Sequence, residues 1–421
     1  MGFWLVSWVG FQCVVVTFKE DSPVRNRLPD PRPLALASTM SQDMIPDFLA
    51  EQRDETPEEL QGLILKFENF WERKLWHQLT EALLQFFRDP RSEPQRLAFY
   101  KVFVLKFADK INQLKLVELA LAASTQCPNE REKLHFLEAL MKKVDHENTQ
   151  DALVYASVAV ARVKLELDDR DGARKDLSNC ERILDSLASV DTVVHAAFYD
   201  ANATYYQIIT DFAAYYRNAL LYLACIDVNS LSSDEKESRA YHLSVAALVS
   251  ESIYNFGELL LHPILDVLVR SKDYPWLREL LFAFNRGDLD AFDRLSNHIA
   301  SNELLHQHTG ELRQKIYLAA LTEAIFQRPP HDRSISFKDV AESTKVRPNE
   351  IEHLIMKAFS LGLLRGTIDQ VDEIAHITWV QPKVLDMKQI ANMRQRLLDW
   401  DSSVNNLGHY IENKGKDVWA V

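Results

Sequence analysis

One histidine pair in this sequence has the spacing of a metal-binding motif. His306 and His308 form an H-x-H pair, the pattern with which one class of zinc hydrolase begins its ligand set. That motif requires a serine and an aspartate further along the chain, and the corresponding positions hold Ile316 and Ala319. Because two histidines without a third ligand do not hold zinc, we expect no metal site here.

Other local patterns of catalysis are also missing from the sequence. An H-E-x-x-H pattern starts at His146, but Gln150 occupies the position of the second histidine. The sequence contains no P-loop, no G-x-S-x-G turn and no G-x-G-x-x-G turn. We therefore expect a protein that is not an enzyme and needs no cofactor.

The cysteines and the net charge narrow the classes of function further. The cysteines lie far apart and form no C-x-x-C pair: Cys13, Cys127, Cys180 and Cys225. This spacing indicates neither a disulfide framework nor a zinc cluster, and it favours a reducing compartment. Asp and Glu number 61 against 48 Lys and Arg, so the formal net charge is -13. Because such a charge without a basic stripe repels a phosphate backbone, we expect no nucleic acid as a partner.

Residues 1–43 differ in composition from the rest of the chain. The first 18 residues carry no charge and include Trp4 and Trp8, and a proline-rich stretch follows. One reading is that this leader is irrelevant or not native, with translation starting at Met40 or Met44. The other two readings are a targeting sequence and a membrane anchor. No Lys or Arg precedes the apolar run, which argues against the last two readings. We expect a disordered or non-native segment and no membrane partner.

Composition and hydrophobic periodicity predict a mainly α fold. The 421 residues include 11 Gly and 15 Pro, which favours long helices joined by short loops. Apolar residues recur at three- and four-residue steps from Leu60 onward. Two such stripes, residues 153–167 and 173–187, flank an acidic turn and predict a helical hairpin. Because successive pairs at this spacing bury each other's faces, we predict a TPR-like right-handed α-solenoid over residues 44–211.

The pattern changes in the second half of the chain. Helices continue through residues 212–330, and residues 331–382 predict a winged helix. Its expected elements are a strand at residues 334–337, helices at 338–344 and 348–361, and two strands around a wing at 369–373. Alternation predicts that each of these two strands has one apolar face, formed by Leu364, Gly366 and Ile368 and by Ala375, Ile377 and Trp379.

The charges of the winged helix favour protein over nucleic acid as its partner. Its second helix mixes acidic and basic residues, and its wing carries Asp369, Asp372 and Glu373. Acidic groups at this place oppose the electrostatic attraction that dominates DNA affinity. We therefore expect contact with protein through the edge of the sheet, while nucleic-acid binding stays the alternative. The expected contact residues are Ile335, Phe337, Ile368, Ile377 and Trp379.

The last helix has the most regular apolar pattern in the chain. Residues 383–421 predict a helix with a seam spaced 3, 4, 3, 4, 3, 4: Ile390, Met393, Leu397, Trp400, Val404, Leu407 and Ile411. Ser and Asn residues between them are poor helix formers, so this helix needs packing partners. Either the seam docks on the chain's own body or it joins a helical bundle with other chains, which we prefer.

The layout and several stretches of sequence resemble one family. A helical-repeat body, a winged helix and a terminal helix form the layout of PCI proteins, scaffold subunits of the proteasome lid, the signalosome and a translation-initiation complex. The stretches that resemble a proteasome-lid member of this family are KLWHQL at 74–79, NFGELL at 255–260, WLRELLFAFNRGD at 276–288 and TWVQP at 378–382. The resemblance runs in the same order and spacing from about Phe67 to about Leu398.

This resemblance implies a non-catalytic scaffold subunit of the proteasome lid, in the cytoplasm and nucleus, that supports ubiquitin-dependent degradation. It implies a PCI domain over residues 212–382, a winged helix aligned edge to edge with those of neighbouring PCI subunits, and a last helix within a bundle that drives lid assembly. A ubiquitin-receptor subunit is an implied neighbour. The alternatives are a PCI scaffold of the signalosome or of a translation-initiation complex, and a winged-helix nucleic-acid binder.

Overall fold

The computed structural model describes residues 45–146, 149–271, 274–328, 333–382 and 387–419. The chain divides into two compact units, Met1–Asp227 and Val228–Val421. The expected leader, residues 1–43, lies outside the described residues. Within the described ranges, no helix combines the length and the apolar composition needed to cross a bilayer.

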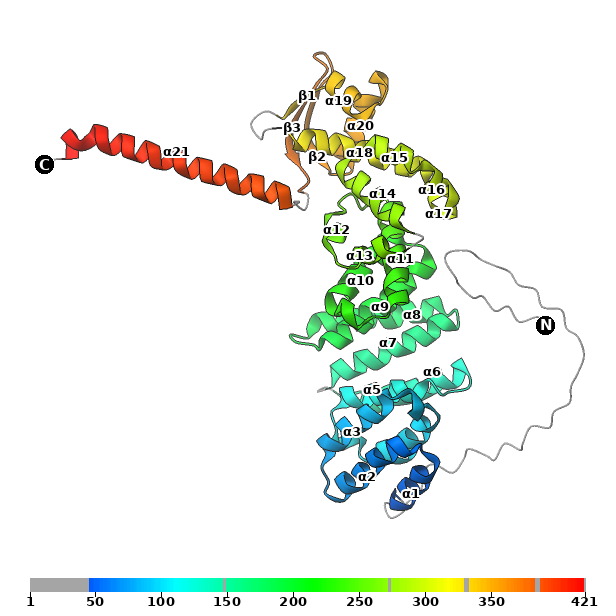
Figure 1. Ribbon diagram of the computed structural model, residues 1–421. Coiled ribbons are helices and arrows are strands. Elements are labelled where there is room, and N and C mark those ends of the chain that lie inside the picture. The colour runs from blue at the N-terminus through cyan, green and yellow to red at the C-terminus, as the bar shows by residue number, and fades with distance from the viewer. Residues whose placement is uncertain (1–44, 147–148, 272–273, 329–332, 383–386, 420–421) are drawn as a thin grey trace, which may run out of the picture. The chain divides into compact units, whose positions relative to one another are not determined.

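The first unit consists of helices that lie side by side in sequence order (Figure 1). Their bounds are α1 Ile45–Glu55, α2 Glu58–Glu72, α3 Trp76–Arg88, α4 Arg96–Ala98, α5 Gln113–Ser124, α6 Glu130–Val144, α7 Gln150–Glu166, α8 Arg170–Ser186, α9 Thr192–Ile209 and α10 Phe212–Cys225. Each helix packs its apolar face against its neighbours, and the core includes the fully buried rings of Phe67, Phe86 and Phe99. The predicted mainly α fold is confirmed.

The predicted helical hairpin is formed by α7 and α8. Between them, Asp168 adopts a left-handed conformation with a φ of 63°. The Asp169 carboxylate then accepts a hydrogen bond from the Gly172 backbone N–H at 3.0 Å. Because this cap satisfies a free N–H group of the first turn, α8 begins at Arg170, inside the segment that the sequence pattern predicts as a turn.

The boundary between the two units lies between Asp227 and Val228, further along the chain than the boundary that we expected after residue 211. The helix that follows this position, α10, packs against α9 and belongs to the first unit. Asp211 caps it by accepting hydrogen bonds from the N–H groups of Ala213 and Ala214, both at 3.1 Å. An apolar stripe does not reveal which neighbour it packs against, so the sequence pattern could not assign α10. The PCI domain bounds of 212–382 stay a prediction.

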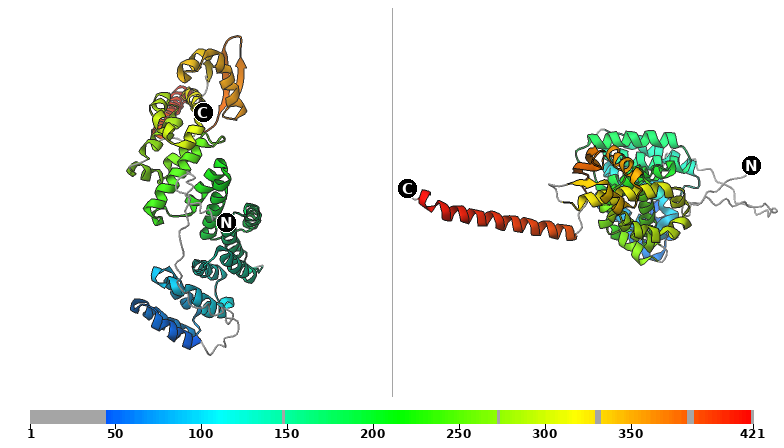
Figure 2. Two further views of the ribbon diagram at one scale, coloured as in Figure 1. Left: turned by 90° about the vertical axis from the view of Figure 1, so that its right-hand side faces the viewer. Right: turned by 90° about the horizontal axis from the view of Figure 1, so that it is seen from above.

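The second unit begins with helices and ends with a winged helix and one long helix. Their bounds are α11 Ser233–Val249, α12 Gly257–Leu261, α13 Leu265–Arg270, α14 Pro275–Arg286, α15 Leu289–Arg294, α16 Ser296–Ser301, α17 Glu303–Gln307, α18 Thr309–Phe326, β1 Ser334–Ser336, α19 Phe337–Thr344, α20 Pro348–Ser360, β2 Leu364–Asp369, β3 Ile374–Val380 and α21 Met387–Trp419. The right-hand view of Figure 2 shows α21, in red, as one uninterrupted helix.

Gly287 and Asp288 separate α14 from α15. Gly287 ends α14 with a φ of 68°, and the Asp288 carboxylate caps α15 by accepting a hydrogen bond from the Ala291 N–H at 3.0 Å. A Cβ atom at Gly287 would lie 2.5 Å from the Cα atom of Ala320. Glycine is therefore needed at this position for two reasons: the left-handed conformation of its backbone and the close approach of α18.

The segment around Pro263 contains two short helices. Pro263 falls in the break between α12 and α13, because proline cannot donate the backbone hydrogen bond that a continuous helix needs. Gly257 is the first residue of α12. Its N–H donates a hydrogen bond to the Asn255 side chain at 3.1 Å, so a local polar contact precedes this helix start.

A buried lysine closes the C-terminus of α11. Lys315 on α18 is 6% exposed, and its Nζ donates hydrogen bonds to the carbonyl oxygens of Ala247, Leu248 and Ser250 at 2.8, 3.0 and 2.7 Å. The Nζ also lies 5.2 Å from the centre of the Phe256 ring. The last carbonyl groups of a helix lack intrahelical donors, and the Lys315 ammonium group donates the missing hydrogen bonds. Its positive charge also lies at the negative end of the helix dipole, which is favourable.

The winged helix has the predicted order of elements. Its strands form an antiparallel sheet in the order β1-β3-β2, and α19 and α20 pack on the sheet. Ile335, Ile351 and Leu364 lie in its core, to which α18 contributes Leu321 and Ile325. The wing runs from the end of β2 at residue 369 to the start of β3 at residue 374, as predicted.

A β-bulge changes the face on which Trp379 lies. Arg365 pairs with Trp379 and Gly366 pairs with Ile377, so the register shifts between Arg365 and Gly366. Ala375 and Ile377 are buried while Trp379 is 37% exposed, which makes the predicted shared face wrong at Trp379. The extra residue of the bulge moves Trp379 away from the core face. A Cβ atom at Gly366 would lie 2.1 Å from the His376 carbonyl oxygen, so glycine permits this close pairing.

Candidate protein-interaction surfaces

The seam of α21 is exposed to solvent along its whole described length. Its exposed fractions range from 46% at Ile390 to 68% at Trp400. The members of the seam are Ile390, Met393, Leu397, Trp400, Val404, Leu407 and Ile411, as the heptad spacing predicts. Contiguous apolar surface of this kind marks a site of interaction, because soluble proteins seldom leave it uncovered. The seam is the first candidate site.

Two of the poor helix formers in α21, both serines, bond to the helix's own backbone. The Ser402 hydroxyl donates to the Leu398 carbonyl oxygen at 2.9 Å, and the Ser403 hydroxyl donates to the Asp399 carbonyl oxygen at 2.8 Å. Such bonds satisfy the serine side chains within the helix but add little to its stability. The helix therefore depends on packing along the seam, which agrees with its predicted need for partners.

The edge of the winged-helix sheet is the second candidate site, and the structure places the expected contact residues unequally. Ile335 and Ile377 are buried in the core, whereas Phe337 and Ile368 are partly buried against it. Ile335 and Ile368 lie on the edge strands β1 and β2, but Ile377 and Trp379 lie on the central strand β3. Contact through Ile335 or Ile377 would therefore use backbone groups, since their side chains fill the core. These contacts stay predictions.

Trp379 is the expected contact residue with the most exposed side chain in this sheet. β1 pairs with β3 as far as His376. Among the described residues, the end of β3 that carries Trp379 therefore has a partner strand on one side, where Arg365 of β2 lies opposite. The Arg365 guanidinium lies 4.8 Å from the centre of the Trp379 ring, a cation–π distance. This pair forms a polar and aromatic rim beside an incompletely paired strand.

The wing keeps its acidic groups at the surface. The Asp369 carboxylate accepts hydrogen bonds from the N–H groups of Val371 and Asp372 at 3.0 and 3.1 Å. Gln370 donates to the Glu352 carboxylate of α20 at 3.2 Å, which joins the wing to that helix. Carboxylates thus occupy the surface that would approach a phosphate backbone, which is unfavourable for nucleic-acid binding.

The candidate metal motif lies on helices that pack into the core. His308 directly follows the end of α17, and its Nδ1 lies 2.8 Å from a carboxylate oxygen of Glu311. The positions at which the motif requires Ser and Asp hold Ile316 and Ala319, both buried on α18. In the part of the chain that the structure describes, no group of three His, Cys, Asp or Glu side chains could hold a metal ion.

Three family models match consecutive parts of the chain. They describe PSD13 N-terminal repeats over residues 63–281, a PCI domain over 289–379 and an Rpn9 C-terminal helix over 383–415. A probable 26S proteasome regulatory subunit rpn9 of Schizosaccharomyces pombe is 43% identical to this chain over 89% of the chain and 97% of its own length. This chain belongs to the Rpn9 family.

Further relatives agree with membership in the Rpn9 family. The 26S proteasome regulatory subunit RPN9 of Saccharomyces cerevisiae is 38% identical over 89% of this chain and 98% of its own length. Eukaryotic translation initiation factor 3 subunit M of Emericella nidulans is 27% identical over 42% of this chain and 40% of its own length. The resemblance to PCI proteins is therefore confirmed, and the model for the Rpn9 C-terminal helix covers the entire seam of α21.

Proposed function

We infer that this chain is a non-catalytic structural subunit of the lid of the 26S proteasome regulatory particle, where it supports ubiquitin-dependent protein degradation. The observation that carries this inference is the similarity to proteasome subunits of the Rpn9 family over 89% of the chain. The exposed seam of α21 supports it, because a scaffold subunit needs surfaces that other chains complete. Similarity to the initiation-factor subunit covers only 42% of the chain, so it supports the alternative, a scaffold of a translation-initiation complex, less strongly.

We propose that α21 inserts its seam into a helical bundle formed with other lid subunits. Helices that share a heptad seam bury it against one another, and each large apolar side chain that is covered contributes about 1.5–3 kcal/mol. We also propose that the winged-helix sheet pairs at its edges with the sheets of neighbouring PCI subunits. A ubiquitin-receptor subunit is the proposed further neighbour, and the proposed compartments are the cytoplasm and the nucleus.

Affinity purification of the tagged full-length chain from gentle lysates tests this function. We expect stoichiometric recovery with proteasome lid subunits, and a chain that lacks residues 390–421 should lose them. Recovery of signalosome or initiation-factor subunits in their place would show the alternative scaffold function. A free monomer would contradict a scaffold function altogether, and normal incorporation of the shortened chain would contradict the bundle.

A further inference from the structure

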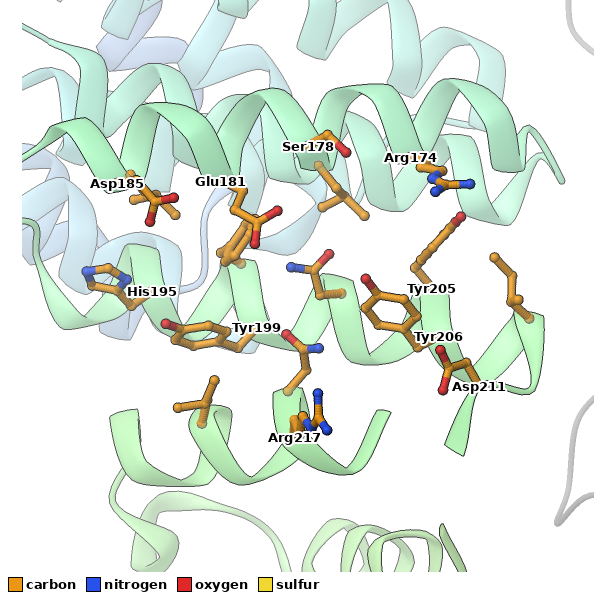
Figure 3. A pocket seen from close by; sticks show the side chains of 17 residues that line it. Arg174, Ser178, Glu181, Asp185, His195, Tyr199, Tyr205, Tyr206, Asp211 and Arg217 are labelled. Atoms are coloured by element: carbon orange, nitrogen blue, oxygen red, sulfur yellow. The ribbon is translucent and has the colours of Figure 1, made fainter. Parts of the chain in front are cut away.

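A pocket in the first unit is lined by three consecutive helices, α8, α9 and α10 (Figure 3). Its volume is about 750 Å³, within the range of ligand-binding pockets. Side chains of α9 form its floor, and those of α8 and α10 form its two walls. None of the surfaces that carry the proposed scaffold function lies in this unit.

The floor of the pocket is a polar and aromatic stripe along one face of α9. His195, Tyr199, Asn202 and Tyr206 follow one another at steps of three or four residues and are all half-buried. The His195 and Tyr199 rings are stacked, with centres 6.1 Å apart. The opposite face of α9, with Val194 and its neighbours, fills the core, so the stripe is free to contact a ligand.

Charged groups of opposite sign occupy the two ends of the pocket. Glu181 and Asp185 of α8 lie beside Tyr199, and Arg174 lies at the other end of α8 beside Tyr206. Burial raises the pKa of Tyr199, and the charges of Cys225, Asp185 and Glu181 add to this effect, so this tyrosine stays neutral. Arg217 of α10 also faces the pocket. Asp211 lines the same end as Arg174, but its carboxylate caps α10 by accepting hydrogen bonds from the N–H groups of Ala213 and Ala214.

These charges lack the partners that other charged groups of the same helices have. Asp176 of α8 pairs with Lys164 at 2.6 Å, and Asp200 of α9 pairs with Arg162. Within the described ranges, by contrast, the charged groups that line the pocket form no ion pair: Arg174, Glu181, Asp185, Asp211 and Arg217. Two carboxylates one helical turn apart repel each other, so the acidic end would be stabilised by a cation.

A buried tyrosine also lacks a hydrogen-bond partner at this site. Tyr205 is 7% exposed and lines the pocket, and its hydroxyl group points toward α8 on the side of Arg174 (Figure 3). This hydroxyl has no hydrogen-bond partner among the described residues. The hydroxyl oxygen is not among the buried polar atoms that lack a partner, so solvent reaches it through the pocket and a polar group of a bound chain can take the place of that water.

We propose that the pocket binds an extended segment of a partner protein that carries one basic and one acidic side chain. The basic side chain lies between Glu181 and Asp185 and against the Tyr199 ring, and the acidic side chain lies between Arg174 and Arg217. A helix with side chains is about 10–12 Å wide, so two or three turns would exceed the volume of the pocket, whereas an extended strand fits. Backbone amides of the segment reach Asn202 and the Tyr205 hydroxyl.

The length of α8 determines the spacing of the two charges. From Arg174 to the midpoint between Glu181 and Asp185 this helix rises by roughly 13 Å at 1.5 Å per residue. An extended chain covers that length in about four residues at 3.3 Å per residue, and side chains four positions apart point to the same side. The expected ligand therefore has a basic residue and an acidic residue separated by three others, in either chain direction.

Selection of a random dodecapeptide library on the full-length chain tests this proposal. We expect enrichment of peptides with the two charges at this spacing, and binding that weakens as salt rises. E181K/D185K should weaken the selected peptide at least tenfold, and Tyr205→Phe by about fivefold, the value of one net hydrogen bond. R174E/R217E should instead bind a peptide in which lysine replaces the acidic residue.

The control variant changes charges on α8 that do not line the pocket. K175E/R182E should bind the selected peptide as the unchanged chain does, and circular dichroism should report the same helix content for every variant. Failure to enrich this pattern would overturn the proposal. The proposal would also be overturned if the selected peptide bound the pocket variants as tightly as the unchanged chain. Self-association of the chain that E181K/D185K abolishes would overturn it too, because the pocket would then bind a second copy of this chain.

Discussion

At the scale of single residues, Lys315 shows how a buried charge can join distant helices. Burial lowers the pKa of its ammonium group to about 7, and the nearby Glu311 carboxylate acts in the opposite direction. The three carbonyl groups that it contacts belong to the end of α11 and the residue after it, more than sixty positions earlier in the chain. The protonation of this lysine is therefore linked to the stability of the α11–α18 packing.

The stability that depends on Lys315 should increase from pH 7 to pH 10. In this window the unfolded chain, with an ordinary lysine pKa of 10.5, binds more protons than the folded chain, so raising the pH favours folding. Lys315→Met should lower the free energy of opening of α11 by about 1–3 kcal/mol at pH 9, because its terminal carbonyls lose their donor. The loss should be smaller at pH 6, where the folded protein must bury a charged ammonium group.

Hydrogen exchange of the α11 and α18 amides, corrected for the intrinsic rates, measures these differences. Lys357→Met is the matched control, since Lys357 is exposed and belongs with Lys315 to the lining of one pocket in the second unit. An equal loss at pH 6 and pH 9 would show that the protonation of Lys315 is not linked to folding. The sequence contains a weak signal for this residue, a lysine on the apolar face of α18 between Leu312 and Ala319. Its carbonyl partners could not be predicted, because they come from a different helix.

At the scale of elements, α21 combines a regular apolar seam with a backbone that depends on packing. Its seam side chains remain exposed, so substitutions there should alter assembly without disturbing either hydrophobic core. Aspartate at the centre of a buried bundle would place an unpaired charge in an apolar contact, which is strongly unfavourable. The seam is thus a place where assembly and folding can be measured separately.

Leu397→Asp combined with Trp400→Asp should reduce incorporation into the lid at least tenfold, because both side chains lie at the centre of the seam. Co-purification of lid subunits with the tagged chain measures the effect. Ser402→Asp with Asn406→Asp adds the same charge on the opposite side of α21 and should leave incorporation unchanged. Equal recovery of lid subunits with both variants would contradict a role for the seam.

The type and order of most elements could be predicted from the sequence, because helical and strand periodicities are local. The winged helix and α21 are examples. The side of β3 on which Trp379 lies could not be predicted, since a bulge depends on the pairing of two strands and not on the alternation within one. The pocket of α8, α9 and α10 was also missed. Its signal was a polar and aromatic stripe at helical spacing on α9, the face opposite to the one that fills the core.

At the scale of the whole molecule, the two units have separate cores and carry different surfaces. The core of the first unit is formed by residues from Ile45 to Tyr205, and the winged-helix core by residues from Leu318 to Val380. The seam and the sheet edges both belong to the second unit. Assembly and the proposed peptide binding can therefore be assigned to different parts of the chain.

A chain of residues 228–421 should enter the lid, because it contains both candidate assembly surfaces. Residues 1–227 alone should not be recovered with lid subunits in stoichiometric amounts. Sedimentation of lysates from cells that express each part would show which one moves with the large complex. Comigration of residues 1–227 with the complex, in the absence of the second unit, would show that the main assembly contacts lie in the first unit and would contradict this assignment.

The uncovered seam also has a consequence for the amount of this protein that a cell can maintain. Copies made in excess of their partners would expose this stripe to chaperones and to one another, and such surfaces lead to aggregation or degradation. Free chain should therefore be short-lived, while the incorporated chain persists. The cellular amount of this protein would then follow the scarcest of its partners and not its own rate of synthesis.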